Sequence, residues 1–222
     1  MKLYLYSHCP YCVRVQMGFH LKALPVEEIY LSYDDEETPG RLIGRKMLPI
    51  LEDADGIMGE SLDILQKIDG LSGHRSFDQT PREEITEWLA RWKATIYGLV
   101  LPRVANPGLP EFRTARARAA FVEAKERAYG PFTRLLERSG KLMSDMERGL
   151  HELSTILPRT HQVGIDDILL FPMLRSINIV NAMPANRDVQ DYYDRIASLT
   201  GFSLHDLGQR EGAVRGNGLA AG

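Results

Sequence analysis

The sequence has only two cysteines in 222 residues, and Cys9 and Cys12 stand three positions apart. A disulfide between them would close too small a loop to constrain the unfolded chain, so a stabilising cross-link explains the pair poorly. A zinc site needs four ligands, but there is no third cysteine and the six histidines show no paired ligand spacing. In a reducing compartment, a close pair of cysteines is more typical of redox chemistry than of an inert pair.

Long apolar runs and an excess of positive charge are also lacking. No hydrophobic run approaches the roughly 18 residues needed to cross a bilayer, and the first residues are too few for a signal peptide. The net charge of −3 gives no electrostatic basis for binding nucleic acid. We therefore expect a cytoplasmic protein without nucleic-acid or membrane partners, long enough to bury one large core or two small ones.

The spacing of apolar residues in the first 70 positions predicts a small α/β unit in the order βαβαββα. The strands are expected at residues 3–6, 26–31, 48–51 and 57–58, and the helices at residues 10–24, 38–44 and 61–70. Pro10 suits the first turn of a helix because its missing N–H would have no partner there. Ser61 is expected to cap the third helix, and the acidic run at residues 34–37 to form a solvated loop.

The pattern changes after a linker-like stretch, and no strand pattern follows residue 80. Helical stripes then continue to Gly201, with a kink expected at residues 130–131 and a bend at Pro172. Trp88 and Trp92 share one stripe and are expected to belong to the core. The predicted organisation is an α/β domain at residues 1–72, a linker at 73–82, an all-helical domain at 83–207 and a disordered tail at 208–222.

The cysteine pair lies at the start of the first predicted helix. Backbone N–H groups and the helix dipole favour a thiolate at Cys9, and the thiolate is the attacking species in thiol–disulfide exchange. Cys12, one turn inside the helix, is expected to be less exposed and able to attack a mixed disulfide at Cys9. Because the pair follows a strand and opens a helix, it strongly indicates a redox motif.

Two further motifs have both an ordinary and a functional interpretation. Leu48-Pro49 precedes a strand, where an X-Pro bond is cis in only about 5–6% of cases and an edge-strand proline is common. Glu60-Ser61 opens a helix, which is explained by capping or by an anion-binding helix N-terminus. The residues alone leave both alternatives open.

Taken together, these motifs resemble the glutaredoxin branch of the thioredoxin fold, and the helical second part is similar to that of the glutathione transferases. Over roughly residues 1–205 the sequence is identified as a member of the bacterial glutaredoxin 2 family. The stretches that carry the resemblance are residues 7–12, 48–51, 60–64, 87–89, 101–103, 166–172 and 174–175. It implies a thioredoxin-like α/β domain followed by an all-α domain, in a glutathione-transferase-like architecture.

The resemblance also implies an activity and its catalytic residues. The chain would be a dithiol glutaredoxin in which Cys9 forms the mixed disulfide with glutathione and Cys12 resolves it. Its substrates would be glutathione mixed disulfides and disulfide-containing proteins. Glutathione would serve as reductant, no metal is expected, and the working unit would be a monomer.

A glutathione-binding set follows from the same resemblance. Pro49 would be cis, and the backbone of Leu48 would bind the cysteinyl part of glutathione as an added strand would. Glu60 and Ser61 would hold the γ-glutamyl end, and Tyr11 would lie beside the active thiol. From charge and position, we add Arg45 or Lys46 as the partner of the glycyl carboxylate.

Three alternatives remain beside the dithiol glutaredoxin. A cysteine-type glutathione transferase or dehydroascorbate reductase would need Cys9 alone. A non-catalytic, transferase-like binding module would need neither cysteine, and some glutaredoxins hold a glutathione-bridged iron–sulfur cluster. The presence of Cys12 favours the dithiol enzyme.

Overall fold

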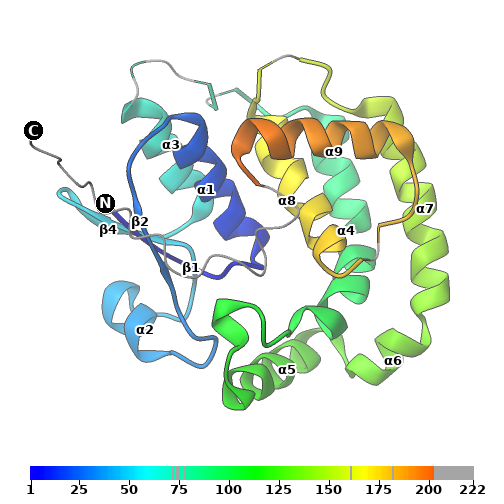
Figure 1. Ribbon diagram of the computed structural model, residues 1–222, viewed down its shortest axis with the longest axis horizontal. Helices are drawn as coiled ribbons and strands as arrows, with labels where there is room; N and C mark the ends of the chain where they lie inside the picture. The colour runs from blue at the N-terminus through cyan, green and yellow to red at the C-terminus, as the bar shows by residue number, and fades with distance from the viewer. Residues whose placement is uncertain (72, 74–75, 78, 161, 182, 203–222) are drawn as a thin grey trace, which may run out of the picture.

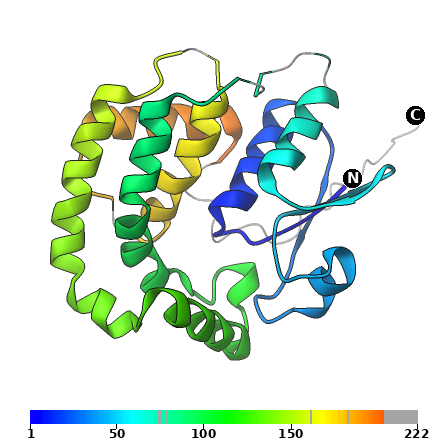
Figure 2. The same ribbon diagram turned by 180° about the vertical axis from the view of Figure 1, so that it is seen from behind.

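The computed structural model describes residues 1–202 except 72, 74–75, 78, 161 and 182. The predicted tail at 208–222 lies outside the described residues, as does the end of the predicted helical domain. Figure 1 shows an α/β part beside an all-helical part, and Figure 2 shows the same pair from behind. This arrangement confirms the expected fold class.

The first part is built around a four-stranded sheet. Its elements are β1 (Lys2–Leu5), α1 (Pro10–Leu21), β2 (Glu27–Tyr30), α2 (Glu37–Ile43), β3 (Ile50–Asp53), β4 (Gly56–Met58) and α3 (Ser61–Leu71). The strand order is β2-β1-β3-β4, with β1 and β2 parallel and the other pairs antiparallel. Figure 1 shows α1 and α3 on one side of this sheet and α2 on the other. The loop after β1 therefore delivers Cys9 to the start of α1.

Two local expectations in this part are wrong in detail. Ser61 does not cap α3 but is its first residue, and its side chain is buried, while Glu60 precedes it at a φ of 65°. The acidic run is not simply a solvated loop, because Asp35 accepts a hydrogen bond of 2.9 Å from the Thr38 N–H. Glu37 already lies in the first turn of α2, where a negative charge is favourable.

The second part is entirely helical among its described residues. Its elements are α4 (Glu83–Val104), the 3₁₀ helix η1 (Pro110–Phe112), α5 (Ala115–Tyr129), α6 (Phe132–Glu137), α7 (Ser139–Ile156), α8 (Ile165–Ile179) and α9 (Arg187–Thr200). The kink expected at residues 130–131 is a complete break between α5 and α6. Gly130 adopts a φ of 84° and a ψ of 172°, which ends the helix, and Pro131 has no N–H with which to continue it. Pro172 stays inside α8.

Trp88 and Trp92 lie in the helical core, as predicted. They are 2% and 8% exposed, and the Trp88 Nε1–H donates a hydrogen bond of 2.7 Å to the Gly149 carbonyl. Gly149 lets α7 approach the indole of Trp92, because a Cβ there would stand 2.8 Å from the ring. The sequence stripe identified the tryptophans but gave no indication of this glycine.

Gly149→Ala is expected to lower the free energy of unfolding by about 1–3 kcal/mol, because a rigid indole leaves no room for a methyl group. Urea unfolding followed by tryptophan fluorescence would measure the change. Gly140 is the matched control on the same helix, since a Cβ there would meet nothing within 4 Å. Gly140→Ala should leave stability unchanged or raise it by up to about 1 kcal/mol; equal losses in both variants would contradict the packing argument.

The two parts share one apolar core and several polar links. Tyr4, Val13 and Met17 belong to the same buried cluster as Ile168 and other residues of α8. Arg175 on α8 donates a hydrogen bond of 2.9 Å from Nη1 to the Ser7 carbonyl. The helical part therefore holds the loop that leads into Cys9.

Candidate functional site

Cys9 and Cys12 lie at the beginning of α1 with different exposures. Cys9 is the residue before the helix, with an extended backbone (φ −76°, ψ 119°), and its side chain is partly exposed. Cys12 is fully buried, and its sulfur accepts a hydrogen bond of 3.5 Å from the Tyr6 N–H. The expected difference in accessibility between the two thiols is therefore present.

The electrostatic surroundings separate the two thiols further. A hydrogen bond from the Cys12 thiol lowers the pKa of Cys9 to about 6, against burial, and the charge of His8 and nearby backbone N–H groups lower it too. Burial and the neighbouring Cys9 sulfur raise the pKa of Cys12 well above its ordinary value. At neutral pH Cys9 is thus the thiolate and Cys12 the thiol, as a nucleophile and a resolving group require.

A buried carboxylate from the helical part holds the loop before Cys9. Glu111 on η1 is fully buried and accepts hydrogen bonds from the Ser7 hydroxyl (2.9 Å), the His8 N–H (3.0 Å) and the His8 ring at Nδ1. Burial opposes its ionisation, but the hydrogen bond and charge of His8 outweigh this and keep the pKa of Glu111 below its ordinary value. Glu111 and His8 therefore link the two parts through a short contact between the carboxylate and the ring.

The sequence alone gave no indication of this pair. Its only local signal is a lone acidic residue at position 111 between Pro110 and Phe112, and such a residue is usually solvated. Tyr33 and Phe112 pack around the His8 ring, with centroid distances of 6.5 and 4.9 Å. Burial in this cluster raises the pKa of Tyr33 to about 12. Water is thus excluded from one side of the site, which strengthens its charge interactions.

Leu48-Pro49, the second predicted element, is a cis peptide, as the resemblance implies. Leu48 and Cys9 both pack, partly buried, against the same two apolar clusters. Ser61 lies in the first turn of α3.

The expected anion-binding cations are engaged in ion pairs. Arg45 Nη2 lies 2.8 Å from Glu60 Oε1, with both side chains exposed. Lys46 Nζ lies 3.2 Å from Glu36 Oε1 and above the Tyr33 ring.

Tyr11, the remaining predicted residue, contacts the helical part. Lys93 Nζ on α4 donates a hydrogen bond of 3.3 Å to the Tyr11 hydroxyl. Burial raises the pKa of Tyr11, but its interactions with Tyr97 and Lys93 outweigh burial and lower it. The sequence gave no means of naming these partners on α4.

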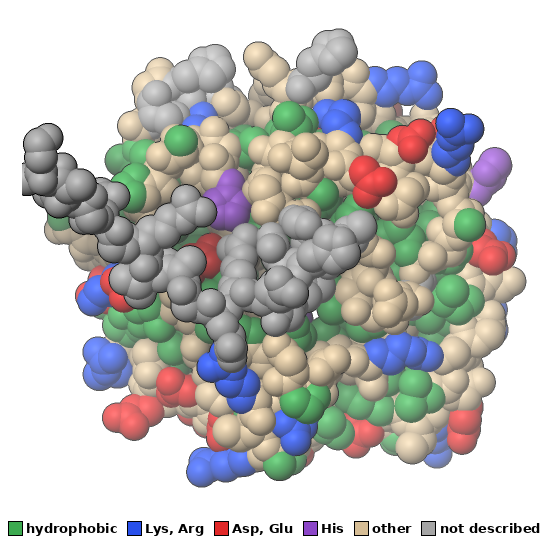
Figure 3. Space-filling model, viewed as in Figure 1, with side chains coloured by type: hydrophobic (Ala, Val, Ile, Leu, Met, Phe, Trp, Pro, Cys, Tyr) green, Lys and Arg blue, Asp and Glu red, His purple; other side chains and the backbone are tan. Residues whose placement is uncertain are grey.

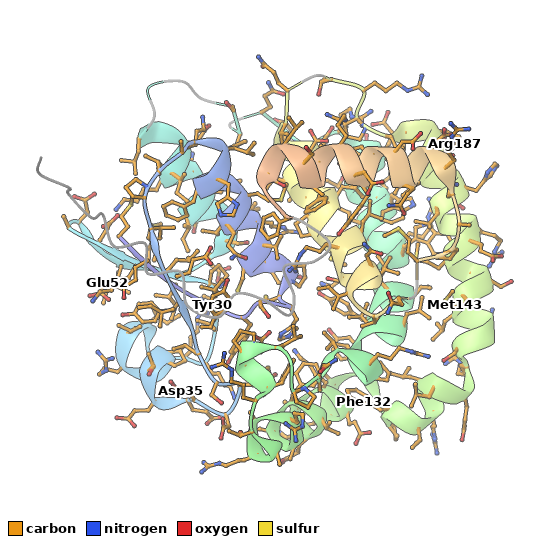
Figure 4. All side chains as sticks on the ribbon, in the orientation of Figure 1. Tyr30, Asp35, Glu52, Phe132, Met143 and Arg187 are labelled. Atoms are coloured by element: carbon orange, nitrogen blue, oxygen red, sulfur yellow. The ribbon has the colours of Figure 1, made fainter. Side chains whose placement is uncertain are left out.

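Helix α5 borders the site, because its Phe121 ring packs edge to face against the His8 ring with centroids 5.6 Å apart. Figure 4 shows it between the labelled Asp35, beside α2, and the labelled Phe132, at the start of α6. Its Arg116 pairs with Asp34 at 3.1 Å, which joins α5 to the first part.

Two other kinds of site find no support among the described residues. No cluster of three or more His, Cys, Asp or Glu side chains is placed to hold a metal ion in this part of the chain. None of the helices described is both long and apolar enough to cross a membrane.

Comparison with known proteins gives matches along most of the chain. The family described as "Glutaredoxin 2, C terminal domain" matches residues 84–207, and "Glutathione S-transferase, N-terminal domain" matches residues 3–76. Glutaredoxin 2 of Escherichia coli K12 is 39% identical over 209 residues, covering 92% of this chain and 97% of that protein.

Solved structures agree with these matches. The crystal structure of glutaredoxin 2 from Salmonella typhimurium in complex with glutathione superposes with a TM-score of 0.85 at 38% identity, covering 91% of this chain and 95% of that one. A glutathione S-transferase from Rhodospirillum rubrum F11 superposes with a TM-score of 0.64 at 16% identity, covering 90% of this chain and 89% of that one. The second likeness shows the fold alone.

Proposed function

We propose a dithiol mechanism for this chain, which belongs to the glutaredoxin 2 family and is a glutathione-dependent oxidoreductase. The observation that carries the proposal is the contrast between the two sulfurs. Cys9 is partly exposed with a pKa of about 6, whereas Cys12 is buried behind it with a raised pKa. A single-thiol enzyme would need only a hydrogen-bond donor at this place, whereas a dithiol enzyme needs a second sulfur.

The steps follow from that contrast. The Cys9 thiolate attacks one sulfur of a substrate disulfide, forms a mixed disulfide and releases the other sulfur as a thiolate. The Cys12 thiol loses its proton and attacks Cys9, which forms a Cys9–Cys12 disulfide and releases the reduced substrate. Two glutathione molecules then return two electrons to the pair and leave as oxidised glutathione. Cys9 and Cys12 would thus be a redox-active disulfide in electron transfer.

We assign glutathione binding to Tyr11, Leu48, Pro49, Glu60 and Ser61. Leu48 packs against the same small apolar cluster as Cys9, and its backbone would pair with an extended peptide. Ser61 lies in the first turn of α3, where backbone N–H groups lack helical partners and attract a carboxylate. Glu60 adds a negative charge that suits an amino group.

We also propose the setting in which the enzyme works. A pair that cycles through glutathione needs the reducing glutathione pool of the cytoplasm. Both parts of one chain supply the site, since Glu111 contacts His8 in the loop before Cys9 and Lys93 contacts Tyr11 in the first turn of α1. This supports a monomer acting on disulfide-bearing proteins.

A comparison of substrate classes tests the proposal. The wild-type protein should reduce a mixed disulfide of glutathione with a small thiol, and a protein disulfide, when coupled to glutathione reductase. Both rates should exceed its rates of dehydroascorbate reduction and of glutathione conjugation to an electrophile. Fast conjugation or dehydroascorbate reduction without protein-disulfide reduction would instead indicate a cysteine-type transferase, and no activity on any substrate would indicate a binding module.

A further inference from the structure

Two lysine–tyrosine pairs of the helical part face the Cys9 side of the molecule. Lys93 and Tyr97 stand on α4, and Lys125 and Tyr129 on α5, each pair four residues apart and so on one face of its helix. The Tyr97 and Tyr129 rings meet edge to face with centroids 5.5 Å apart. The two pairs therefore form one surface, the lysine–tyrosine wall, made of Lys93, Tyr97, Lys125 and Tyr129.

The wall adjoins the redox motif directly. Lys93 Nζ donates a hydrogen bond of 3.3 Å to the hydroxyl of Tyr11, which lies between the two cysteines in sequence. Tyr97 also acts on Tyr11 and, against the effect of burial, helps to lower its pKa. The Arg14 guanidinium lies 4.8 Å from the Tyr11 ring centroid on its own helix. A substrate that reaches Cys9 must therefore pass close to these groups.

The two lysines of the wall have charge available for a ligand. In the part of the chain that the structure describes, neither ammonium group takes part in an ion pair. Lys46, by contrast, pairs with Glu36. Lys125 is partly buried, which lowers its pKa, while the nearby Cys9 sulfur favours its charged form. An anion beside Lys125 would offset the lost hydration of its ammonium group.

The overall charge of the chain gives no strong positive field that would attract an anion from a distance. On the face that Figure 3 shows, acidic and basic side chains are scattered over the surface, and the net charge of the chain is −3. Selection of a charged substrate must then come from groups near Cys9 rather than from long-range steering.

We propose that the lysine–tyrosine wall is a specificity site that selects disulfides whose reacting cysteine is flanked by carboxylates. Lys93 and Lys125 would meet the carboxylates, and Tyr97 and Tyr129 would pack against the substrate backbone and aliphatic groups. The inference rests on the proposed function and names its substrate class: an acidic segment of a protein disulfide. The carboxylates of glutathione itself are the other possible source of the same charge.

Glutathionylated peptides that differ only beside the cysteine test this inference. One carries two Glu on each side of the modified Cys and the other two Lys, and kcat/KM is measured at a fixed glutathione concentration. The wild type should favour the Glu peptide by about tenfold, since each exposed charge pair contributes a few-fold. The double variant K93Q/K125Q should bring this ratio close to one, K93R/K125R should keep it, and high salt should shrink it.

A control variant and two contrary results show whether the lysines act on the substrate, on glutathione or on the fold. Lys141 on α7 already pairs with Asp145, and K141Q should leave the ratio unchanged. If K93Q/K125Q lowers kcat/KM equally on both peptides, the lysines act on glutathione or on the fold and the inference is wrong. An unchanged ratio also overturns it. A wild type that is inactive on both peptides overturns the proposed function as well.

Discussion

Cys9→Ser is expected to lose at least about a thousandfold in reduction of both glutathione mixed disulfides and protein disulfides. A serine hydroxyl is not ionised at neutral pH, and Cys12 is fully buried and holds its proton, so no second thiolate can replace Cys9. Both rates are measured in an assay coupled to glutathione reductase, with the same preparation of each protein for both substrates.

Cys12→Ser is the matched variant for this prediction. It should keep mixed-disulfide reduction within about fivefold of the wild type, because a serine hydroxyl can still donate a hydrogen bond to the Cys9 thiolate and glutathione can resolve the intermediate. Reduction of protein disulfides should be lost, because that step needs the second thiol. If Cys12→Ser matches the wild type on both substrates, the chain works as a single-thiol enzyme.

Glu111→Gln is expected to be the most damaging substitution outside the cysteines. It weakens the contact with the largely buried His8 ring and the hydrogen bonds that the buried carboxylate accepts from the Ser7 hydroxyl and the His8 N–H, which together cost about 3 kcal/mol of the free energy of unfolding. It also loosens the His8 ring, whose charge helps to lower the pKa of Cys9 to about 6. The pKa of Cys9 should therefore rise. A rise of one pH unit would lower the thiolate fraction, and so the alkylation rate at pH 6, about fivefold. Iodoacetamide labelling against pH, read by mass spectrometry at Cys9, measures this.

The comparison for Glu111→Gln is Glu87→Gln, an exposed carboxylate of α4 that should change neither quantity. Ser7→Ala removes one hydrogen bond to Glu111 without altering charge, and should lower stability less while leaving the alkylation profile in place. If Glu111→Gln lowers the pKa of Cys9, direct repulsion between the two anions outweighs the effect of His8 and the positioning account is wrong.

The Glu111 carboxylate also makes the free energy of unfolding depend on pH. The pKa of Glu111 is lower in the folded protein than its ordinary value, so the folded state binds fewer protons than the unfolded state in that range. The stability that ionised Glu111 contributes is therefore complete above its ordinary pKa of about 4.5. It is lost as the pH falls through the pKa of Glu111 in the folded protein. The acid-induced loss of stability should be smaller in Glu111→Gln.

What the sequence revealed about the site is local in the chain. Cys9, Tyr11 and Cys12 are specified by a strand, a proline and a helix start within about ten residues, and each of these leaves a pattern in the sequence. The βαβαββα order followed from the same kind of signal. Two boundaries were predicted wrongly. A serine at a helix start can stand before the first turn or inside it, and the sequence does not distinguish these places at Ser61. A Gly-Pro pair can bend a helix or end it, and the sequence does not distinguish these outcomes at residues 130–131.

What the sequence could not reveal depends on contacts between distant positions. Glu111 meets His8 from 103 residues away, and Lys93 meets Tyr11 from 82 residues away. Neither Glu111 nor Lys93 differs in its neighbours from the many acidic and basic residues that face solvent. Only the packing of η1 and α4 against the first part gives these side chains a role near the cysteines.

Trapping the mixed disulfide between Cys9 and glutathione would show whether Cys9 is the residue that reacts. Reduced Cys12→Ser protein is mixed with oxidised glutathione at pH 7, quenched with acid, and its intact mass is measured. We expect one glutathionyl group per chain, located on Cys9 by peptide mapping, and none on Cys9→Ser protein treated alike. If the Cys12→Ser protein stays unmodified while the wild type reduces mixed disulfides, Cys9 does not carry the mixed disulfide.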